Sequence, residues 1–212
     1  MLTVLGGDRA SPTIGCHFVL ACVVMLALSA CTAREVPYED EIASWHADKD
    51  RFMRESPDSP VLAPERAAFP PLPYYPINRE YRVPASLTVA RADDILDMQT
   101  STGQRRKMQR IGALEFTLKG QPLKLTAFAE AADTSLRRLF VPFHDLTNGS
   151  DTYPGGRYLD LERTATGVYD LDFNRAYHPF CVFNAEYDCP YPPRENRLPV
   201  PVRAGELLGR SK

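Results

Sequence analysis

Residues 110–130 have the sequence Arg-Ile-Gly-Ala-Leu-Glu-Phe-Thr-Leu-Lys-Gly-Gln-Pro-Leu-Lys-Leu-Thr-Ala-Phe-Ala-Glu. In the first half, Leu114, Phe116 and Leu118 alternate with polar residues, which is the period of a strand with one buried face. Residues 123–130 alternate in the same way, and residues 119–122 between the two runs contain the turn-forming pair of a glycine and a proline. Two such runs joined by a short turn predict an antiparallel β-hairpin.

Further short segments of strand composition lie on both sides of this hairpin. The chain has no helical segments between them, so they predict an antiparallel β-sandwich or barrel-like domain of the mainly β class, with its body at residues 80–208. The expected strands outside the hairpin are Tyr81–Val89, Ile95–Thr100, Leu139–Phe143, Tyr158–Glu162, Val168–Phe173 and a final strand Val200–Leu207.

One amphipathic helix is predicted before the β body, at Tyr38–Arg54. Its first turn holds three acidic residues, which suit the positive end of a helix dipole, and prolines at 57 and 60 end it. Residues 70–76, rich in proline and aromatic residues, are expected to lie extended across the domain. The apolar side of the helix consists of Ile42, Trp45, Phe52 and Met53, and Trp45 is expected to be a packing residue.

The N-terminal sequence has the pattern expected of an export signal. The apolar run Phe18–Ala30 is too short for a membrane span, which needs about 20 residues, and it suits a signal peptide. It ends in Leu28-Ser29-Ala30-Cys31, which resembles the lipobox of bacterial lipoproteins. We expect residues 1–30 to be a cleaved lipoprotein signal peptide, Cys31 to be acylated, residues 31–37 to be a tether and residues 38–212 to be one globular domain. A plain secretory signal, with a cysteine at the cleavage site by chance, stays open. The segment before the run is weakly charged for a signal peptide, since it carries only Arg9, offset by Asp8.

Acylation makes the membrane a partner, through lipid on Cys31. We expect the protein on the periplasmic side, and on the outer membrane where the host has one, because Thr32 is not the aspartate that favours inner-membrane retention. The net charge of the chain is −2, and it stays −2 without residues 1–30. This balance gives no electrostatic argument for nucleic acid as a partner.

Cys181 and Cys189 are the two cysteines that remain after export and acylation of Cys31. Outside the cytoplasm such a pair predicts a disulfide. The alternative is a metal site that adds His178 and His144. A His-x-x-Cys followed by a lone cysteine is a poor match to the paired ligand spacing of structural zinc sites, so neither metal nor cofactor is predicted.

Polar residues gather in irregular segments between residues 143 and 206. We expect a site that binds a small ligand or a protein partner of the cell envelope where the 152–157 loop meets the 172–178 and 195–196 loops, because loops on a rigid β scaffold commonly carry function. Arg157 has a forked donor suited to carboxylate or phosphate, but a structural bridge to Asp160, Asp172 or Glu195 is equally open. The candidate ligand-binding residues are Arg157, Asp172, Asn174, Tyr177, Glu195 and Asn196.

Two other functions stay open. His178 with Asp172 could activate a hydroxyl in an envelope hydrolase, but the chain has no Gly-x-Ser-x-Gly elbow and no catalytic residue is assigned. The domain could also be purely structural. Gly155 and Gly156 lack the spacing of a phosphate-binding loop and are expected to form a turn with positive φ.

Five motifs of this chain resemble a family known only as domain of unknown function 1684. They are Pro-Phe-x-Asp at 142–145, Thr-Tyr-x-Gly-Gly-Arg-Tyr-Leu at 152–159, Leu-Asp-Phe-Asn-x-Ala-Tyr-x-Pro at 171–179, Cys-Pro-x-Pro-Pro-x-Glu-Asn at 189–196 and Ala-Gly-Glu at 204–206. The resemblance extends from about Trp45 to Glu206 and implies no activity. We expect asparagine in the family at the position of His178, and a residue other than proline at Pro154, so a role carried by His178 alone would not extend to the family.

Overall fold

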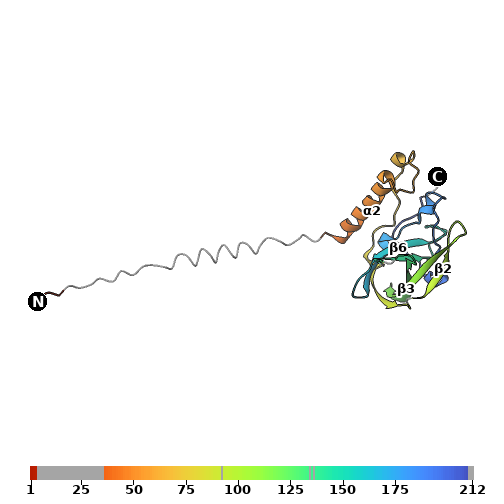
Figure 1. Cartoon of the computed structure of the whole chain (residues 1–212). Coiled ribbons are helices and arrows are strands. Elements are labelled where there is room, and N and C mark those ends of the chain that lie inside the picture. Colours follow the sequence, from red (N-terminus) through yellow and green to blue (C-terminus); the bar gives the residue numbers. More distant parts are fainter. Residues whose placement is uncertain (4–35, 92, 134, 136, 210–212) are drawn as a thin grey trace. The chain divides into compact units, whose positions relative to one another are not determined.

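The computed structural model describes residues 1–3, 36–91, 93–133, 135 and 137–209 (Figure 1). Residues 4–30 of the predicted signal peptide, the lipidation site Cys31 and most of the tether lie outside the described residues. The chain divides into residues 1–37 and a compact unit that begins at Tyr38. In the described part of the chain, no helix has the length and apolar character needed to cross a membrane.

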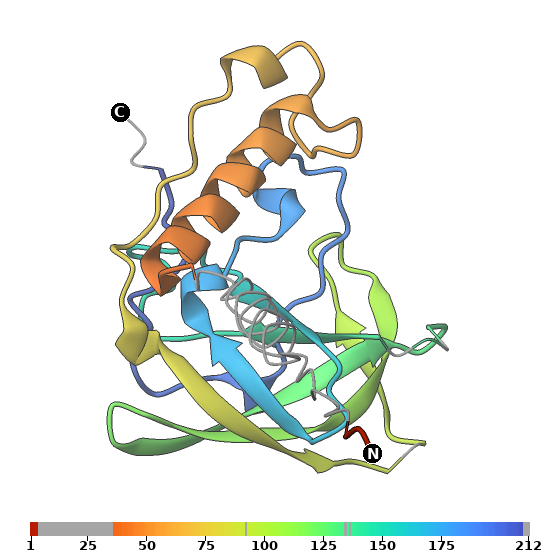
Figure 2. The same ribbon diagram turned by 90° about the vertical axis from the view of Figure 1, so that its left-hand side faces the viewer.

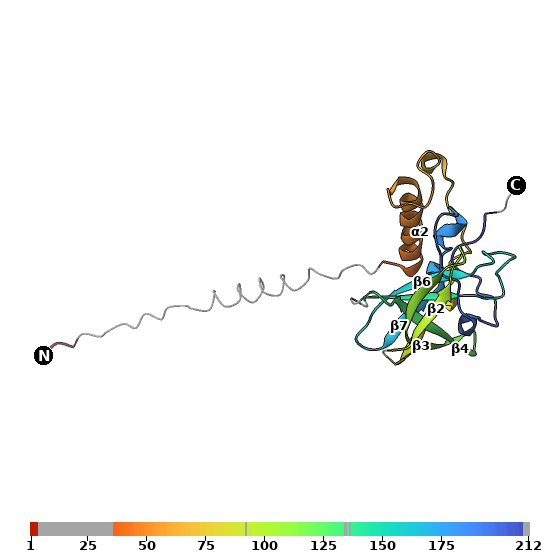
Figure 3. The same cartoon turned by 45° about the vertical axis from the view of Figure 1, so that its right-hand side comes forward.

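The unit from Tyr38 onward is a curled antiparallel sheet of seven strands that forms a nearly closed barrel (Figure 3). The strand order is β6-β5-β4-β3-β1-β7, and β2 pairs with β3 off this path. The mainly β, barrel-like class expected from the sequence is therefore confirmed. The strands are β1 (Arg82–Val89), β2 (Ile95–Gln99), β3 (Arg105–Leu118), β4 (Gln121–Glu130), β5 (Arg138–Phe143), β6 (Arg157–Glu162) and β7 (Val168–Asp172).

The predicted hairpin is the β3–β4 pair at the centre of this sheet. Its register places Leu114 opposite Leu125, and both side chains are buried. The turn is tighter than predicted, because Lys119 and Gly120 both take positive φ and the strands resume at once. The register shifts between Arg110 and Gly112, where a Cβ on Gly112 would lie 2.4 Å from the carbonyl oxygen of Thr88 in β1. Glycine here lets β1 approach β3 closely.

The two faces of the sheet pack against different partners. The inner face encloses the main core, to which the alternate residues of all strands except β2 contribute, among them Leu114, Leu125, Val141, Leu159 and Leu171. The outer face of β2–β5 carries a second small cluster of Met98, Met108 and Phe128, with Phe140 packed against it. Apolar residues on both faces mean that the outer face is also covered.

The helix α2 (Tyr38–Glu55) ends one residue later than predicted and lies over the end of the barrel near β6 (Figures 1 and 2). Ile42 and Met53 are buried as expected, whereas Trp45 is only partly buried. Met53 packs with Val61 and Leu72 in a third apolar cluster. Short 3-10 helices complete the fold: η1 (Arg66–Ala68), η2 (Arg79–Tyr81), η3 (Phe173–Arg175), η4 (Phe180–Val182) and η5 (Arg194–Asn196).

The extended segment at residues 70–76 lies across the domain as predicted, but the expected final strand Val200–Leu207 is wrong. Residues 200–207 hold only one isolated bridge, between Glu206 and Tyr74. Two more backbone bonds join this segment to residues 70–76, from Tyr75 N–H to Gly205 O and from Leu207 N–H to Pro73 O. The C-terminal segment is therefore fastened without joining the sheet.

Candidate functional site

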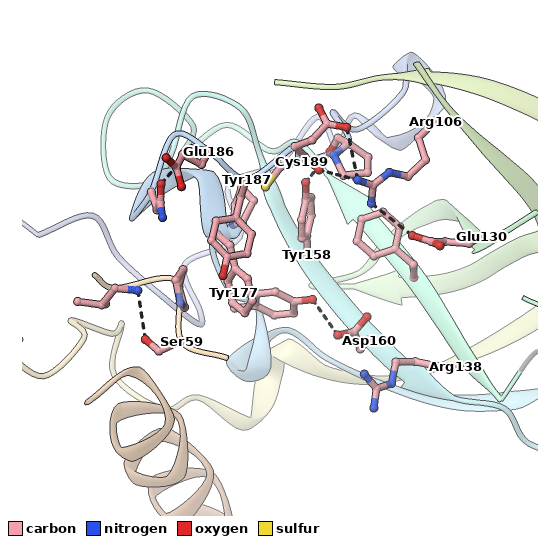
Figure 4. Close-up of a pocket in the computed structure, with 18 of the residues that line it drawn as sticks. Ser59, Arg106, Glu130, Arg138, Tyr158, Asp160, Tyr177, Glu186, Tyr187 and Cys189 are labelled. Carbon is pink, nitrogen blue, oxygen red and sulfur yellow. Dashed lines mark hydrogen bonds and ion pairs between the residues drawn. The ribbon is translucent and has the colours of Figure 1, made fainter. Parts of the chain in front are cut away.

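A cleft of about 960 Å³ opens on the outer face of the sheet (Figure 4). Its floor consists of residues from β3 to β6, including Met108, Phe140 and Tyr158. One wall is the segment 57–66, which follows α2, and the other is the segment 179–190. These two loop segments flank the outer face of the sheet, which carries the apolar cluster of Met98, Met108 and Phe128.

Alternation along β5 and β6 explains why the floor is aromatic and charged. Leu139 and Leu159 point into the core, so their neighbours point outward. Phe140 lies opposite Asp160 in the register, and Arg138 lies opposite Glu162. Arg138, Phe140 and Asp160 thus reach the cleft because the strand period places them on the same outer face.

Five aromatic rings line the cleft, and three contacts between them are close to perpendicular. Phe140 and Tyr158 meet at 77°, Tyr158 and Tyr177 at 90°, and Phe180 and Tyr187 at 88°. The Tyr158 hydroxyl donates to Pro190 O at 2.6 Å, which ties the floor to the second wall. Burial raises the pKa of Tyr158 and of Tyr177, so both hydroxyls stay protonated at neutral pH.

The charged groups of the cleft differ in how they are paired. Arg106 forms ion pairs with Glu130 and Asp188, at 3.3 and 3.4 Å. Arg66 donates to three backbone carbonyls of residues 57–61 and holds the first wall in place. Asp160 accepts a hydrogen bond from the Tyr177 hydroxyl at 2.7 Å. Arg138 is exposed, and among the described residues no hydrogen bond or ion pair holds its side chain.

The two predicted disulfide cysteines lie together in the second wall. Both are thiols in the structure, and Cys189 lines the cleft. The backbone N–H of Cys181 donates to Cys189 Sγ at 3.2 Å. A hydrogen bond from the Cys189 thiol lowers the pKa of Cys181, and that same bond, together with burial, raises the pKa of Cys189. The disulfide stays a prediction that this proximity permits.

Arg157 does not reach the cleft. Its side chain is fully buried and pairs with Asp145, with Nη2 2.8 Å from Oδ2. It also donates to the backbone carbonyls of Val202 and Ala204. The partners considered from the sequence, Asp160, Asp172 and Glu195, are therefore not the ones that Arg157 uses. Its role is to fasten the C-terminal segment to the barrel.

Asp172 and Asn174 anchor the helix α2. The Tyr38 hydroxyl donates to Asp172 Oδ1 at 3.0 Å and accepts from Asn174 Nδ2 at 2.8 Å. Asn174 also exchanges two bonds with the backbone of Asn78, each at 3.0 Å. Both side chains are buried, so their hydrogen-bonding capacity is used within the fold.

Glu195 and Asn196 lie on the barrel away from the cleft. Asn196 is buried and exchanges two hydrogen bonds with the backbone of Thr126, at 2.7 and 2.8 Å. Its side-chain amide thus forms the hydrogen bonds that a neighbouring strand would otherwise form with Thr126. Glu195 is exposed and pairs with Arg110 at 3.0 Å. Of the six candidate residues, only Tyr177 lines the cleft.

His178 and Asp172 have separate partners, so the pair required by the hydrolase alternative does not form. His178 Nε2 accepts from Tyr153 N–H at 3.3 Å, and Nδ1 lies 3.5 Å from Glu206 Oε2. Burial, together with the charges of Arg157 and Lys49, lowers the pKa of His178 to about 3. His178 is a neutral, enclosed histidine whose Nε2 is used by the backbone of Tyr153.

The turn before Arg157 is built as predicted at Gly156, which takes φ of 94°. A Cβ there would lie 2.7 Å from Phe143 O. Gly155 has no positive φ, and what it needs is space, since a Cβ would meet the Tyr153 ring at 2.3 Å. Both glycines therefore serve the packing of the turn.

Sequence reasoning missed the cleft and the residues Arg138, Phe140 and Tyr158 that form its floor. One signal was available: the outward positions of the strands expected at Leu139–Phe143 and Tyr158–Glu162 include aromatic residues, although a solvated face would be polar. An aromatic outer face indicates a covered or ligand-facing surface.

Comparisons with known proteins agree with the motifs. An uncharacterized protein of Haloarcula marismortui with a solution NMR structure is 38% identical and superposes with a TM-score of 0.64. The match covers 81% of this chain and 94% of that protein. No curated protein matches the chain. A family model described as protein of unknown function (DUF1684) matches residues 67–207. The chain therefore belongs to the DUF1684 family, in which five of its motifs had placed it.

Proposed function

We propose that this protein is a lipid-anchored component of the bacterial cell envelope that binds a small organic ligand in the cleft between β3–β6 and the segment 179–190. The observation that carries the proposal is the aromatic-walled cavity of about 960 Å³. This is the upper range of ligand pockets, which are typically about 300–1,000 Å³ and carry a few placed polar groups on a mainly apolar lining.

The composition of the cleft supports binding more than a structural role. The aromatic rings on the outer face of β5 and β6 line an open cleft that the side chains of the covering loops do not fill. A domain that served only as a scaffold would gain stability by filling such a space, because an empty apolar site forfeits packing contacts.

The anchor rests on the sequence. The apolar run Phe18–Ala30 followed by Cys31 supports export and acylation. A Cys31→Ser variant, expressed in the host, is expected to leave the membrane fraction for the soluble periplasmic fraction. Equal membrane retention of both chains would contradict the anchor, and the intact mass of the membrane-bound chain would show whether acylation begins at Cys31.

Ligand binding is tested with three small aromatic probes that share one ring and differ in charge: benzyl alcohol, benzoate and benzyltrimethylammonium. The domain from residue 36 onward suits this test, because the Haloarcula marismortui protein, matched over 94% of its own length, has its structure in solution. NMR titration is expected to shift the amide signals of Phe140 and Tyr187 with at least one probe. If no probe shifts these signals at millimolar concentration, the cleft is not a ligand site.

A further inference from the structure

We propose that the ligand of this cleft is an organic cation, a quaternary ammonium or a protonated amine with an apolar portion, held by aromatic faces and carboxylates. This inference rests on the proposed function and adds the chemical class of the ligand. It follows from the geometry of the rings, the charge balance of the lining and the limited capacity of Arg138 to hold an anion.

The aromatic rings are arranged as a cage. The Phe180–Tyr187 pair belongs to one wall and the Phe140–Tyr158 pair to the floor, and each pair is close to perpendicular. Rings in different orientations line one open cleft, and a ring face that its neighbour does not cover can bind an ammonium group. Tyr187, Tyr158 and Tyr177 surround the open space in Figure 4.

The ring of Tyr187 is the more available one, because Phe180 already stacks on Phe52 with ring centroids 6.1 Å apart. The ring of Tyr177 already holds Lys49, whose Nζ lies 4.0 Å from its centroid. No cation of the described residues lies over Phe180 or Tyr187. A ligand cation would therefore use Tyr187 in this wall, with Tyr177 contributing through its hydrogen bond to Asp160.

The charge of the lining favours a cation. Three arginines face five carboxylates, a net charge of −2 within one cavity. The arginines are Arg66, Arg106 and Arg138, and the carboxylates are Glu130, Asp133, Asp160, Glu186 and Asp188. A cleft lined by an excess of one sign focuses the field and concentrates the opposite charge.

Arg66 and Arg106 are engaged within the fold, so among the described lining residues Arg138 would attract an anion most, and its surroundings oppose this. It stands directly opposite Glu162 across β5 and β6, and Asp160 lies two residues along the same strand. An anion at Arg138 would therefore enter beside two carboxylates. A ligand cation beside Asp160 would lie near one positive side chain, Arg138, and two negative ones, Asp160 and Glu162. The net charge at this edge is therefore negative, as it is in the whole cleft.

The probe series described above tests the inference. Benzyltrimethylammonium is expected to bind at least about fivefold more tightly than benzyl alcohol, within the range that cation–π contacts provide, and benzoate is expected to bind most weakly. Raising the salt concentration is expected to reduce this preference, because exposed charges are screened. Equal binding of all three probes would keep the cleft as a ligand site and overturn the cation.

Substitutions in and near the cleft test which residues cause the preference for the cationic probe. Asp160→Asn retains an acceptor for the Tyr177 hydroxyl and is expected to lower the affinity for the cation by about threefold, as expected for one partly exposed charge. Glu162→Gln removes the same charge from the same strand, outside the cleft lining, and serves as the matched control with a smaller effect. Arg138→Gln is expected to raise the affinity for the cation.

Two variants of Tyr187 distinguish the contribution of its ring to cation binding from that of its hydroxyl. Tyr187→Phe keeps the aromatic face and is expected to retain the preference for the cation, whereas Tyr187→Leu is expected to lose most of it while benzyl alcohol still binds. The inference is overturned if benzoate binds as tightly as the cation, or if Asp160→Asn and Tyr187→Leu both leave the preference unchanged.

Discussion

Arg157 and Asp145 form an ion pair with no solvent exposure of either side chain, with Nη2 2.8 Å from Oδ2. Asp145 also accepts from Val202 N–H at 3.1 Å and Thr147 N–H at 2.8 Å. The pair therefore connects β6, the loop after β5 and the C-terminal segment. Because every oxygen and nearly every donor is used inside the fold, neither residue is available to a ligand.

Removing one partner of this pair is expected to be severely destabilising. Arg157→Met leaves Asp145 buried without its cation and should lower the free energy of unfolding by about 3–5 kcal/mol. Urea unfolding of the domain measures the change. Arg82→Met is the control, since Arg82 pairs with Asp170 on the surface and such pairs contribute about 0–1 kcal/mol. Similar losses for both variants would contradict a special role of the buried pair.

Lys49 is expected to support the buried carboxylate of Glu206. Its Nζ lies 3.3 Å from Glu206 Oε1, and burial raises the pKa of Glu206 although Lys49 lowers it. Lys49→Met should destabilise the domain by about 3–5 kcal/mol at neutral pH, because it leaves a buried charge unpaired. The deficit should shrink as the pH falls, since protonated Glu206 needs no cation.

The double variant Lys49→Met/Glu206→Gln distinguishes charge from packing. If the charge is the cause, the double variant recovers most of the free energy of unfolding that Lys49→Met loses, as a double-mutant cycle measures. If it loses as much as Lys49→Met alone, the contact of Lys49 Nζ with the Tyr177 ring, and not the pairing with Glu206, is what stabilises the domain.

His178 is expected to make the domain sensitive to acid. Its pKa is lowered by burial to about 3 in the folded protein, against an ordinary value of 6.5. Between these values the unfolded chain binds more protons than the folded protein, so the free energy of unfolding falls as the pH falls. The contribution of His178 to the free energy of unfolding is fully present at pH values above 6.5. As the pH falls below 6.5, it is lost with a slope of at most about 1.4 kcal/mol per pH unit.

A His178→Asn variant tests this slope, and asparagine is the residue expected there in the family. Urea unfolding at several pH values between 7 and 4 is expected to give a flatter dependence for the variant. The facing Glu206 has a raised pKa and acts in the opposite direction, so the comparison is made against the parent chain at each pH. Equal slopes would show that His178 does not titrate with unfolding.

Local patterns predicted the strands well, because the alternation in residues 110–130 reports directly which face is buried. The same reasoning failed at Val200–Leu207, where Val200, Val202 and Ala204 also alternate. Pro201 cannot donate to a ladder, and Gly205 takes φ of 77°. The carbonyls of Val202 and Ala204 instead accept from Arg157, a partner more than 40 residues away that no local pattern reveals.

The candidate site was missed for a related reason. The high density of polar residues correctly indicated side chains that form buried hydrogen bonds. Asn174 and Asn196, however, form theirs with backbone groups 96 and 70 residues away in the chain, and not with a ligand. The cleft depends on which loops cover the outer face of β5 and β6. That choice is made by tertiary packing, so Arg138 and Phe140 carried no local sign of their role beyond strand alternation.

Cys181 and Cys189 are expected to form a disulfide in the exported protein. They lie in one wall of the cleft, with Cys181 N–H 3.2 Å from Cys189 Sγ, and closing this short loop should stabilise the domain by about 2–3 kcal/mol. Alkylation under denaturing, non-reducing conditions should then label neither thiol. Two labelled thiols in protein taken from the periplasm would contradict the disulfide.

Because Cys189 lines the cleft, reduction of the disulfide is expected to loosen the segment 179–190 and to weaken the binding of benzyltrimethylammonium. A Cys181→Ser/Cys189→Ser double variant is expected to bind this probe as weakly as the reduced protein does.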